Sequence, residues 1–372
     1  MPQPPQRPLY DTDATAPRVL VVDDSPTMRA LIRRSLEDSG IDVIGEAEDA
    51  VEADTMIKAY NPDAITLDVE MPGMNGLDYL EKLMNTRPMP VVMFSNLTQK
   101  GARQSIEALA SGAFEAVGKP SSPDDLSALN YLGATLRAAV ASNCVPRAAS
   151  RSLLQSAVVP RAEDLPTFRR IVAIGASTGG VEALIRLLSE FPKACPPTLI
   201  AQHILPSFLA ALVEKLDEVV RPTVRIAQPG EELARGTVYF APTNAGHLVL
   251  RSDRLEIVPE TNPDVRTPSI DALFRSVARE FGPRSVGLVL TGLGQDGARG
   301  LLEMRNSGAL TFGQSEGSCS IYDMPKAAMA VGAVEREIHL RQMSKAILRA
   351  ATQEPTRVSL ADRASPALRG LS

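Results

Sequence analysis

Short apolar runs alternate with helical patterns along most of this chain, and this alternation limits the possible folds more than any other feature. Five such runs precede residue 121: RVLVV (18–22), DVIGEA (42–47), DAITLDV (63–69), PVVMFS (90–95) and EAVGKP (115–120). Stretches with helical periodicity lie between them, the first introduced by Ser25-Pro26 as a helix cap and first helical residue. Because parallel strands must be joined by crossovers, five βα repeats predict a doubly wound parallel sheet of the flavodoxin-like kind.

A second α/β block follows a segment that is mixed in charge and rich in Ser, Ala and Pro. It has apolar runs at 170–175, 198–203 and 285–291, each followed by a helical pattern, and residues 224–259 predict short antiparallel strands. The fold class is therefore α/β, with a second parallel-sheet domain that carries a small antiparallel insertion. The expected organisation is a first domain over 17–141, a linker over 142–166, a second domain over 167–352 and a flexible tail over 353–372.

Composition excludes several classes of protein. The 39 Lys+Arg and 44 Asp+Glu give a net charge of −5, which disfavours nonspecific nucleic-acid binding. No run of about 18 apolar residues predicts a membrane span, and the proline-rich N-terminus does not resemble a signal peptide. Three widely spaced cysteines without CxxC predict neither disulfides nor a zinc site. We expect a cytoplasmic protein without direct membrane insertion. A mechanism that uses imidazole for proton transfer at neutral pH has only three candidate histidines in this sequence.

Charged and polar side chains stand at the strand ends of the first domain. Asp23 and Asp24 follow its first strand and Asp68 ends its third, and these strands are neighbours in the flavodoxin-like order. Three converging carboxylates repel one another unless a hard cation such as Mg²⁺ lies among them. Ser95 and Lys119 end the fourth and fifth strands, where a hydroxyl and an ammonium suit a phosphoryl group carried on Asp68.

The second domain contains the elements of a serine hydrolase. GASTG (175–179) matches G-x-S-x-G between a predicted strand and helix, which would place Ser177 on a sharp turn near helix amides. His203 ends the next strand, and Asp296 follows a later one. A serine nucleophile needs an adjacent base, and that base needs an acid to hold its tautomer. The chain order Ser…His…Asp differs from the Ser…Asp…His order of α/β-hydrolases.

A nucleotide site competes with this interpretation. GLGQDG (292–297) matches G-x-G-x-x-G after a strand and before a helix, and Glu316 follows at about the interval of a ribose-binding acid. Such a site would make the chain a nucleotide-binding sensor module without hydrolase activity. Spacing alone leaves both interpretations open.

Residues 18–140 resemble a response-regulator receiver domain through VLVVDDSPTMR, LDVEMPGMNGLD, MFSNLT and GKP. The resemblance implies phosphorylation of Asp68 by a histidine kinase, with Asp23, Asp24 and Asp68 holding Mg²⁺. Receivers commonly have an aromatic switch residue three positions before the lysine, where this chain has Ala116. Coupling to the output is therefore expected to use other contacts, such as Phe114 or the 97–101 loop.

Residues 170–350 resemble the catalytic domain of the chemotaxis protein-glutamate methylesterase/glutaminase family. The resemblance lies in GASTGG, QH, YFAPTNAGHLVL, RTPSIDALFRS, LTGLGQDGARG and MPKAA. It implies Ser177 as nucleophile, His203 as general base and Asp296 as the orienting acid. The implied oxyanion donors are the backbone amides near Thr178 and Leu293, and the esterase chemistry needs no cofactor.

The resemblance also implies a function: hydrolysis of glutamate methyl esters and deamidation of glutamines on chemoreceptors, regulated by the receiver. His247 lies in a family motif outside the triad and is expected to shape the substrate groove, whereas His339 is expected on the surface. A DNA-binding regulator is disfavoured, because no helix-turn-helix with a basic recognition helix follows the linker.

Overall fold

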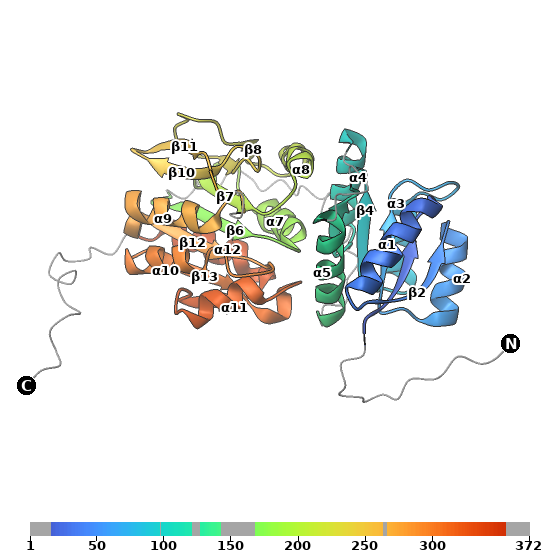
Figure 1. Ribbon diagram of the computed structural model, residues 1–372. Helices are drawn as coiled ribbons and strands as arrows, with labels where there is room; N and C mark the ends of the chain where they lie inside the picture. Colours follow the sequence, from blue (N-terminus) through green and yellow to red (C-terminus); the bar gives the residue numbers. More distant parts are fainter. Residues whose placement is uncertain (1–15, 97, 121–126, 143–167, 263–265, 355–372) are drawn as a thin grey trace, which may run out of the picture. The chain divides into compact units, whose positions relative to one another are not determined.

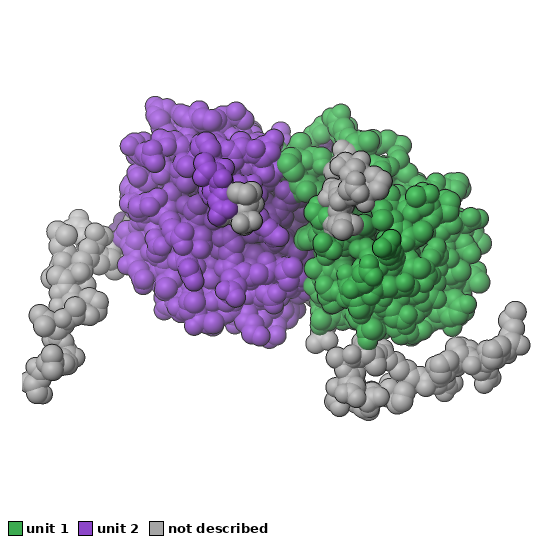
Figure 2. Space-filling model, viewed as in Figure 1, with its two compact units in different colours: residues 1–157, 205–215 green, residues 158–204, 216–372 purple. Residues whose placement is uncertain are grey.

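The computed structural model describes residues 16–354, apart from 97, 121–126, 143–167 and 263–265. The chain divides into two compact units, shown in Figure 2: unit 1 comprises residues 1–157 and 205–215, and unit 2 comprises 158–204 and 216–372. The predicted linker and tail fall almost entirely outside the described residues. Every helix that the structure describes is too short or too polar to cross a lipid bilayer.

Unit 1 has a five-stranded parallel sheet in the order β2-β1-β3-β4-β5, as predicted (Figure 1). Its strands are β1 (Arg18–Val22), β2 (Asp42–Ala47), β3 (Ala64–Asp68), β4 (Val91–Ser95) and β5 (Glu115–Gly118). The intervening and following helices are α1 (Pro26–Asp38), α2 (Ala50–Tyr60), α3 (Gly76–Thr86), α4 (Gln99–Ala110) and α5 (Ser127–Ala141). Ser25 caps α1 as expected, its hydroxyl accepting the amide of Met28. Because β1 and β3 pair directly, their carboxyl ends bring the predicted acidic residues together.

Unit 2 contains a seven-stranded parallel sheet in the order β14-β13-β12-β6-β7-β9-β8. Its strands are β6 (Ile171–Ala176), β7 (Thr198–Gln202), β8 (Thr223–Ile226), β9 (Thr237–Phe240), β12 (Ser285–Val289), β13 (Leu310–Gln314) and β14 (Arg336–Ile338). Its helices are α7 (Gly180–Ser189), α9 (Ile270–Glu280), η1 (Gly282–Arg284), α10 (Ala298–Asn306), η2 (Glu316–Ser318), α11 (Asp323–Ala330) and α12 (Leu340–Thr352). The division between the units falls within α8 (Pro206–Val219), whose residues up to 215 belong to unit 1 and whose remaining residues belong to unit 2. The central strands β12, β6 and β7 lie side by side, so the loops after them meet at one edge of the sheet.

The prediction of antiparallel strands throughout 224–259 was wrong for its first half. Strands β8 and β9 pair in parallel and extend the main sheet through β7. All four residues of β9 are buried, which is typical of a strand covered on both faces. The antiparallel insertion is confirmed, but only as the hairpin of β10 (His247–Arg251) and β11 (Arg254–Val258).

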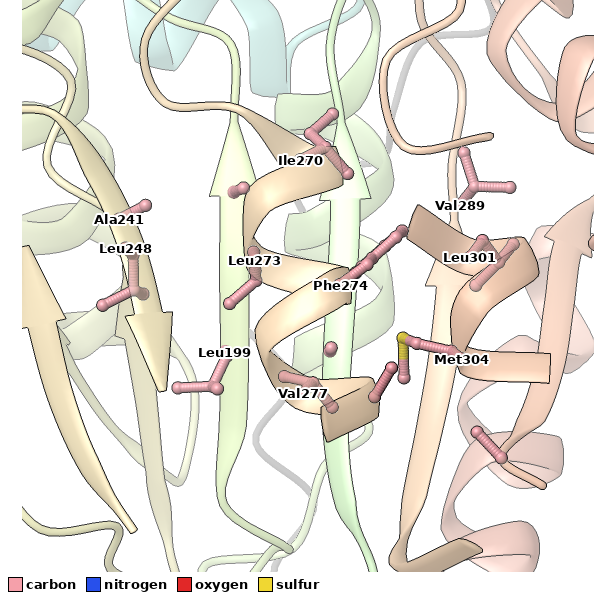
Figure 3. Close-up of a cluster of buried hydrophobic side chains, with 14 of the residues drawn as sticks. Leu199, Ala241, Leu248, Ile270, Leu273, Phe274, Val277, Val289, Leu301 and Met304 are labelled. Atoms are coloured by element: carbon pink, nitrogen blue, oxygen red, sulfur yellow. The ribbon is translucent and has the colours of Figure 1, made fainter. Parts of the chain in front are cut away.

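Helix α9 packs at the centre of the unit 2 core. Figure 3 shows Leu273, Phe274 and Val277 on α9 among buried side chains from neighbouring strands and from α10. The first turn of α9 approaches the sheet so closely that a Cβ on Gly175 would lie 2.2 Å from Ile270 Cγ2. This packing holds the N-terminus of α9 beside the end of β6, where the candidate nucleophile follows.

Candidate functional site

Ser177 lies on a tight turn between β6 and α7, as the motif predicted. Its amide donates to the carbonyl of Thr291 at 3.1 Å, and its carbonyl accepts the amide of Gly180 at 2.7 Å. The same carbonyl accepts Nε2 of Gln202 at 2.9 Å. The residue is only 2% exposed, and no hydrogen bond of its hydroxyl is found among the described residues. The backbone is therefore held on both sides, while the hydroxyl is left available for chemistry.

Two glycines are required around this turn. Gly179 caps α7 at a φ of 75°, and a Cβ there would lie 2.5 Å from the side chain of Ser320. A Cβ on Gly292 would lie 2.6 Å from Ser177 Cβ and 2.2 Å from Met324 Sδ. The backbone of the 292–297 loop thus rests directly on the serine.

Gly292→Ala is expected to displace Ser177 and to cost roughly 1–3 kcal/mol of stability through overpacking. A shift of about 1 Å in a reacting group lowers its rate by about 10²-fold. Labelling of Ser177 by a fluorophosphonate should slow by about that factor, measured by mass spectrometry of the labelled peptide. The control is Gly317→Ala, because a Cβ on Gly317 meets nothing within 4 Å. Equal labelling rates in the two variants would show that the serine does not depend on this packing.

The carboxylate of Asp296 joins His203 to the N-terminus of α9. Its Oδ2 lies 3.0 Å from His203 Nε2 and accepts the amide of Ile270 at 2.8 Å. Its Oδ1 accepts the amide of Asp271 at 2.9 Å and lies 3.4 Å from Ser269 Oγ. Asp296 does not cap the helix that follows it, because Gly297 occupies the N-cap position of α10.

These contacts keep Asp296 ionised. Burial raises the pKa of the carboxyl group, but the hydrogen bonds from His203 and from the Asp271 and Ile270 amides outweigh burial, so its pKa lies below the usual value. The positive end of the α9 dipole acts in the same direction. A carboxylate that stays charged can hold the imidazole in one orientation and stabilise it when it is protonated.

His203 lies between the serine turn and Asp296. Its amide donates to the carbonyl of Ala176 at 3.0 Å, which places it beside the residue that precedes Ser177. Its side chain is 6% exposed, and its buried Nδ1 has no hydrogen-bond partner among the described residues. The structure thus bonds His203 to Asp296 and places Ser177 at the neighbouring strand end, without a hydrogen bond between the serine and the histidine within the described residues.

The predicted oxyanion donors lie in the two loops that flank the serine. Thr178 follows Ser177 directly and is buried, and Leu293 follows the glycine that packs on Ser177. The hydroxyl of Thr291, which the sequence did not single out, lies 3.0 Å from the carbonyls of both Thr178 and Ile321. This hydroxyl links the GASTG and GLGQDG motifs in space. Because Thr291 and Thr178 are 113 residues apart in the sequence, the spacing of the motifs could not predict the contact.

The nucleotide interpretation of GLGQDG is not supported. Gly292 packs on Ser177, and Gly297 packs on Ile270, so these glycines serve contacts within the protein. Asp296 between them faces His203, and Glu316 lies in the short helix η2.

His247 and His339 differ in their surroundings. His247, expected to shape a substrate groove, is buried, and both of its ring nitrogens are bonded to protein groups. His339 is exposed, as predicted, and its Nδ1 accepts the amide of Arg341 at the start of α12.

Four of the five polar residues predicted at the strand ends of unit 1 come together, and the fifth, Ser95, ends the neighbouring strand β4. One carboxylate oxygen from each of Asp23, Asp24 and Asp68 lies within 4.8 Å of the others. Lys119 Nζ lies 2.7 Å from both Asp23 Oδ2 and Asp68 Oδ2. Ser95 is buried on β4, and its carbonyl accepts the amide of Lys119.

This carboxylate set fits a hard divalent cation. Asp23 and Asp68 are almost fully buried, whereas Asp24 is exposed, so a cation would keep access to water. Asp23 Oδ2, although close to Lys119, accepts no aligned hydrogen bond from the residues that the structure describes. Burial raises the pKa of Asp68 despite its contact with Lys119. Burial lowers the pKa of Lys119, but its pairs with Asp23 and Asp68 prevail and raise it, so the ammonium stays charged.

The expected routes of coupling in unit 1 are partly described. Ala116 lies buried on β5 opposite Met93 of β4, and Phe114 is buried just before that strand. Of the predicted 97–101 loop, residue 97 lies outside the described residues, Thr98 caps α4, and residues 99–101 form its first turn. Whether these contacts transmit phosphorylation stays a prediction.

Comparison with known proteins gives matches over both units. Residues 172–347 match the family model CheB methylesterase, and residues 19–130 match the response regulator receiver domain. The chain is 46% identical over 345 residues to protein-glutamate methylesterase/protein-glutamine glutaminase 1 of Rhizobium johnstonii, covering 91% of this chain and 98% of that one. It is 48% identical over 336 residues to the protein of the same name from Caulobacter vibrioides, covering 89% and 97%.

Among solved structures, the CheB methylesterase catalytic domain of Thermotoga maritima aligns with a TM-score of 0.47 and 26% identity, covering 49% of this chain and 99% of that chain. The response regulator domain of CheB from the same organism aligns with a TM-score of 0.31 and 37% identity, covering 34% and 96%.

Proposed function

The chain belongs to the protein-glutamate methylesterase/protein-glutamine glutaminase family, and we propose that it hydrolyses glutamate methyl esters and deamidates glutamines on chemoreceptors, under control of phosphorylation. The observation that carries this proposal is the bond between His203 Nε2 and Asp296 Oδ2, next to the Ser177 turn. A base oriented by a charged acid beside a serine on a strand–helix turn is the arrangement that acyl transfer needs.

In the proposed reaction, His203 accepts the Ser177 proton while Oγ attacks the side-chain carbonyl carbon of the substrate. Because Nε2 is engaged with Asp296, Nδ1 is the ring nitrogen that can take this proton. The backbone amides of Thr178 and Leu293 would hold the oxyanion. The C–O or C–N bond then breaks, and His203 delivers its proton to the leaving group, which departs as methanol or ammonia. Water hydrolyses the Ser177 ester by the reverse proton path and leaves a glutamate carboxylate.

We further propose that Asp68 accepts a phosphoryl group from a histidine kinase, with Ser95 and Lys119 contacting the transferred group. Asp23, Asp24 and Asp68 would hold Mg²⁺, which supplies neutralising charge for the transfer when bound. Lys119, already within 2.7 Å of Asp68, supplies a fixed positive charge for the phosphoryl oxygens. Both the kinase and the methylated receptor region would place the reaction in the cytoplasm.

The proposed organisation is a receiver domain over 17–141, a linker over 142–166, a catalytic domain over 167–352 and a tail over 353–372. Phosphorylation would shift the receiver between two states that differ in how readily a receptor reaches Ser177. This regulation follows from the receiver being joined to a hydrolase in one chain.

The test is methanol release from methylated receptor, with and without a small phosphodonor such as acetyl phosphate. We expect the phosphodonor to accelerate the wild type and to have no effect on Asp68→Asn, because the acceptor oxygen is lost. Asp42→Asn, which removes an exposed carboxylate at the start of β2, should respond as the wild type does. Removal of divalent cations with EDTA should abolish the stimulation and leave the basal rate unchanged.

Absence of any methanol release, with or without phosphodonor, would contradict the proposed hydrolysis. Full stimulation of Asp68→Asn would contradict only the assignment of the phosphorylated residue.

A further inference from the structure

Outside the proposed triad, the structure contains a second histidine–carboxylate pair. Its histidine accepts a hydrogen bond from the residue that caps the N-terminus of α9, the same helix end that holds Asp296. His247 begins β10 and is 8% exposed. Its Nε2 lies 2.9 Å from Glu260 Oε2, and its Nδ1 accepts the amide of Ser269 at 2.9 Å. Both ring nitrogens are therefore bonded within the protein.

These contacts determine which nitrogen of His247 carries the proton. Glu260 Oε1 accepts the amides of Thr261 and Asn262, each at 2.7 Å. Those hydrogen bonds, together with that of His247, lower the pKa of Glu260, so the carboxylate is an acceptor on both oxygens. Nε2 must then be the donor to Glu260, and Nδ1 must present a lone pair to Ser269. The ring is held as the neutral Nε2–H tautomer.

Ser269 is the residue through which this pair reaches the triad. It caps α9, with its Oγ accepting the amide of Ala272 at 3.2 Å. The next two amides, of Ile270 and Asp271, are the donors that hold Asp296. Fixing the Ser269 amide thus fixes the first turn of α9, on which the carboxylate partner of His203 depends.

We propose that His247, supported by Glu260, is a positioning residue for hydrolysis: it holds the first turn of α9 so that Asp296 keeps His203 aligned with Ser177. The inference rests on the proposed function. The body of α9 is packed into the core by Leu273, Phe274 and Val277, so the helix persists without this hydrogen bond. The first turn, which carries the donors to Asp296, is the part that frays when its cap is weakened.

The chain offers variants that separate the acceptor from the rest of the ring. In His247→Asn, Oδ1 stands as many bonds from Cα as Nδ1 does and still accepts the Ser269 amide. His247→Leu removes the acceptor and puts a branched apolar side chain in place of the ring. His339→Leu is the matched control, because His339 Nδ1 also accepts a backbone amide at a helix N-terminus but belongs to α12.

We expect His247→Leu to lower kcat for methyl ester hydrolysis by about 10²-fold with little change in KM, as a misalignment of about 1 Å would. His247→Asn should stay within several-fold of the wild type, and His339→Leu should equal it. The proton on His203 Nε2 should give a low-field NMR resonance that moves in His247→Leu and stays in His247→Asn. With only three histidines in the chain, this resonance is assignable.

Glu260→Gln provides a second test should His247→Leu fail to fold. Since Oε1 accepts two amides, the new NH₂ group must face His247, which forces Nε2 to accept and Nδ1 to carry the proton. Nδ1–H would then oppose the Ser269 amide, and kcat should fall as in His247→Leu.

Wild-type kcat in both His247→Leu and Glu260→Gln would overturn the inference, as would equal losses in the Leu and Asn variants. These outcomes are distinct from failure of the proposed function, in which the wild type itself releases no methanol.

Discussion

Ser177→Ala is expected to lower kcat for methyl ester hydrolysis by about 10⁶-fold, the scale on which removal of a serine nucleophile acts in a triad enzyme. No acyl-enzyme can form without the Oγ atom. The protein should fold as before, because no hydrogen bond of this hydroxyl is found among the described residues and alanine fits where serine does. The loss should therefore appear in kcat, measured as methanol release from methylated receptor, with an unchanged thermal midpoint of unfolding.

The matched control is Ser189→Ala, which removes the serine at the last residue of α7, whose hydroxyl donates to the carbonyl of Arg186. It should keep wild-type kcat. If Ser177→Ala retained more than about one part in a hundred of the wild-type rate, the hydrolysis would need a different nucleophile.

Asp296→Asn is expected to lower kcat by about 10⁴-fold, the loss seen when the orienting acid of a triad is made neutral. The geometry gives a further reason. Oδ1 accepts the amide of Asp271 and Oδ2 accepts that of Ile270, so the NH₂ group of asparagine opposes a backbone amide in either orientation. The variant should thus lose stability as well as the correct His203 tautomer.

The stability loss should depend on pH in a defined direction. The pKa of Asp296 is lowered in the folded protein, so its contribution is present above the pKa of the unfolded chain. That contribution is lost as pH falls through the folded pKa. Asp296→Asn should be less stable than the wild type near neutral pH, and the difference should shrink in the acid range, measured by urea unfolding at a series of pH values.

Asp271→Asn is the control for Asp296→Asn. It removes a carboxylate from the same helix N-terminus, where its Oδ1 accepts the amide of Gly300, without touching His203. It should keep kcat near the wild-type value. A loss of activity as large as that of Asp296→Asn would mean that charge at the end of α9, and not contact with His203, is what the reaction requires.

The sequence was sufficient to predict the strands and strand ends that bear the candidate groups. In a parallel sheet, the ends of neighbouring strands meet at one edge, so locating the five runs of unit 1 also placed Asp23, Asp68 and Lys119 together. The same reasoning predicted that Ser177, His203 and Asp296 lie at the carboxyl ends of strands in one sheet, and β6 and β7, which precede Ser177 and His203, are direct neighbours. The triad assignment itself came from the ordered motifs of the family and not from periodicity.

Features that depend on long-range packing could not be predicted. The hydrogen bonds that hold Asp296 come from backbone amides 25 and 26 residues earlier in the chain. Because nearly every residue has such an amide, the sequence does not show which ones bind the carboxylate. Strands β13 and β14 were missed because one contains Gly and Gln and the other has only three residues. Strands β8 and β9 were assigned to the wrong sheet because short runs do not reveal whether their neighbours are parallel.

Because main-chain amides hold the Asp296 carboxylate, evolution constrains the backbone more than the side chains at the positions that donate to it. Every amino acid except proline brings an N–H group, so drift in the side chain of Asp271 leaves the support of the carboxylate in place. The same drift at Asp296 or His203 removes a partner outright. Proline is therefore expected to be excluded from residue 271, whose side chain is constrained separately by the Gly300 amide, and a lineage that acquired proline there would have to hold its acid by other means.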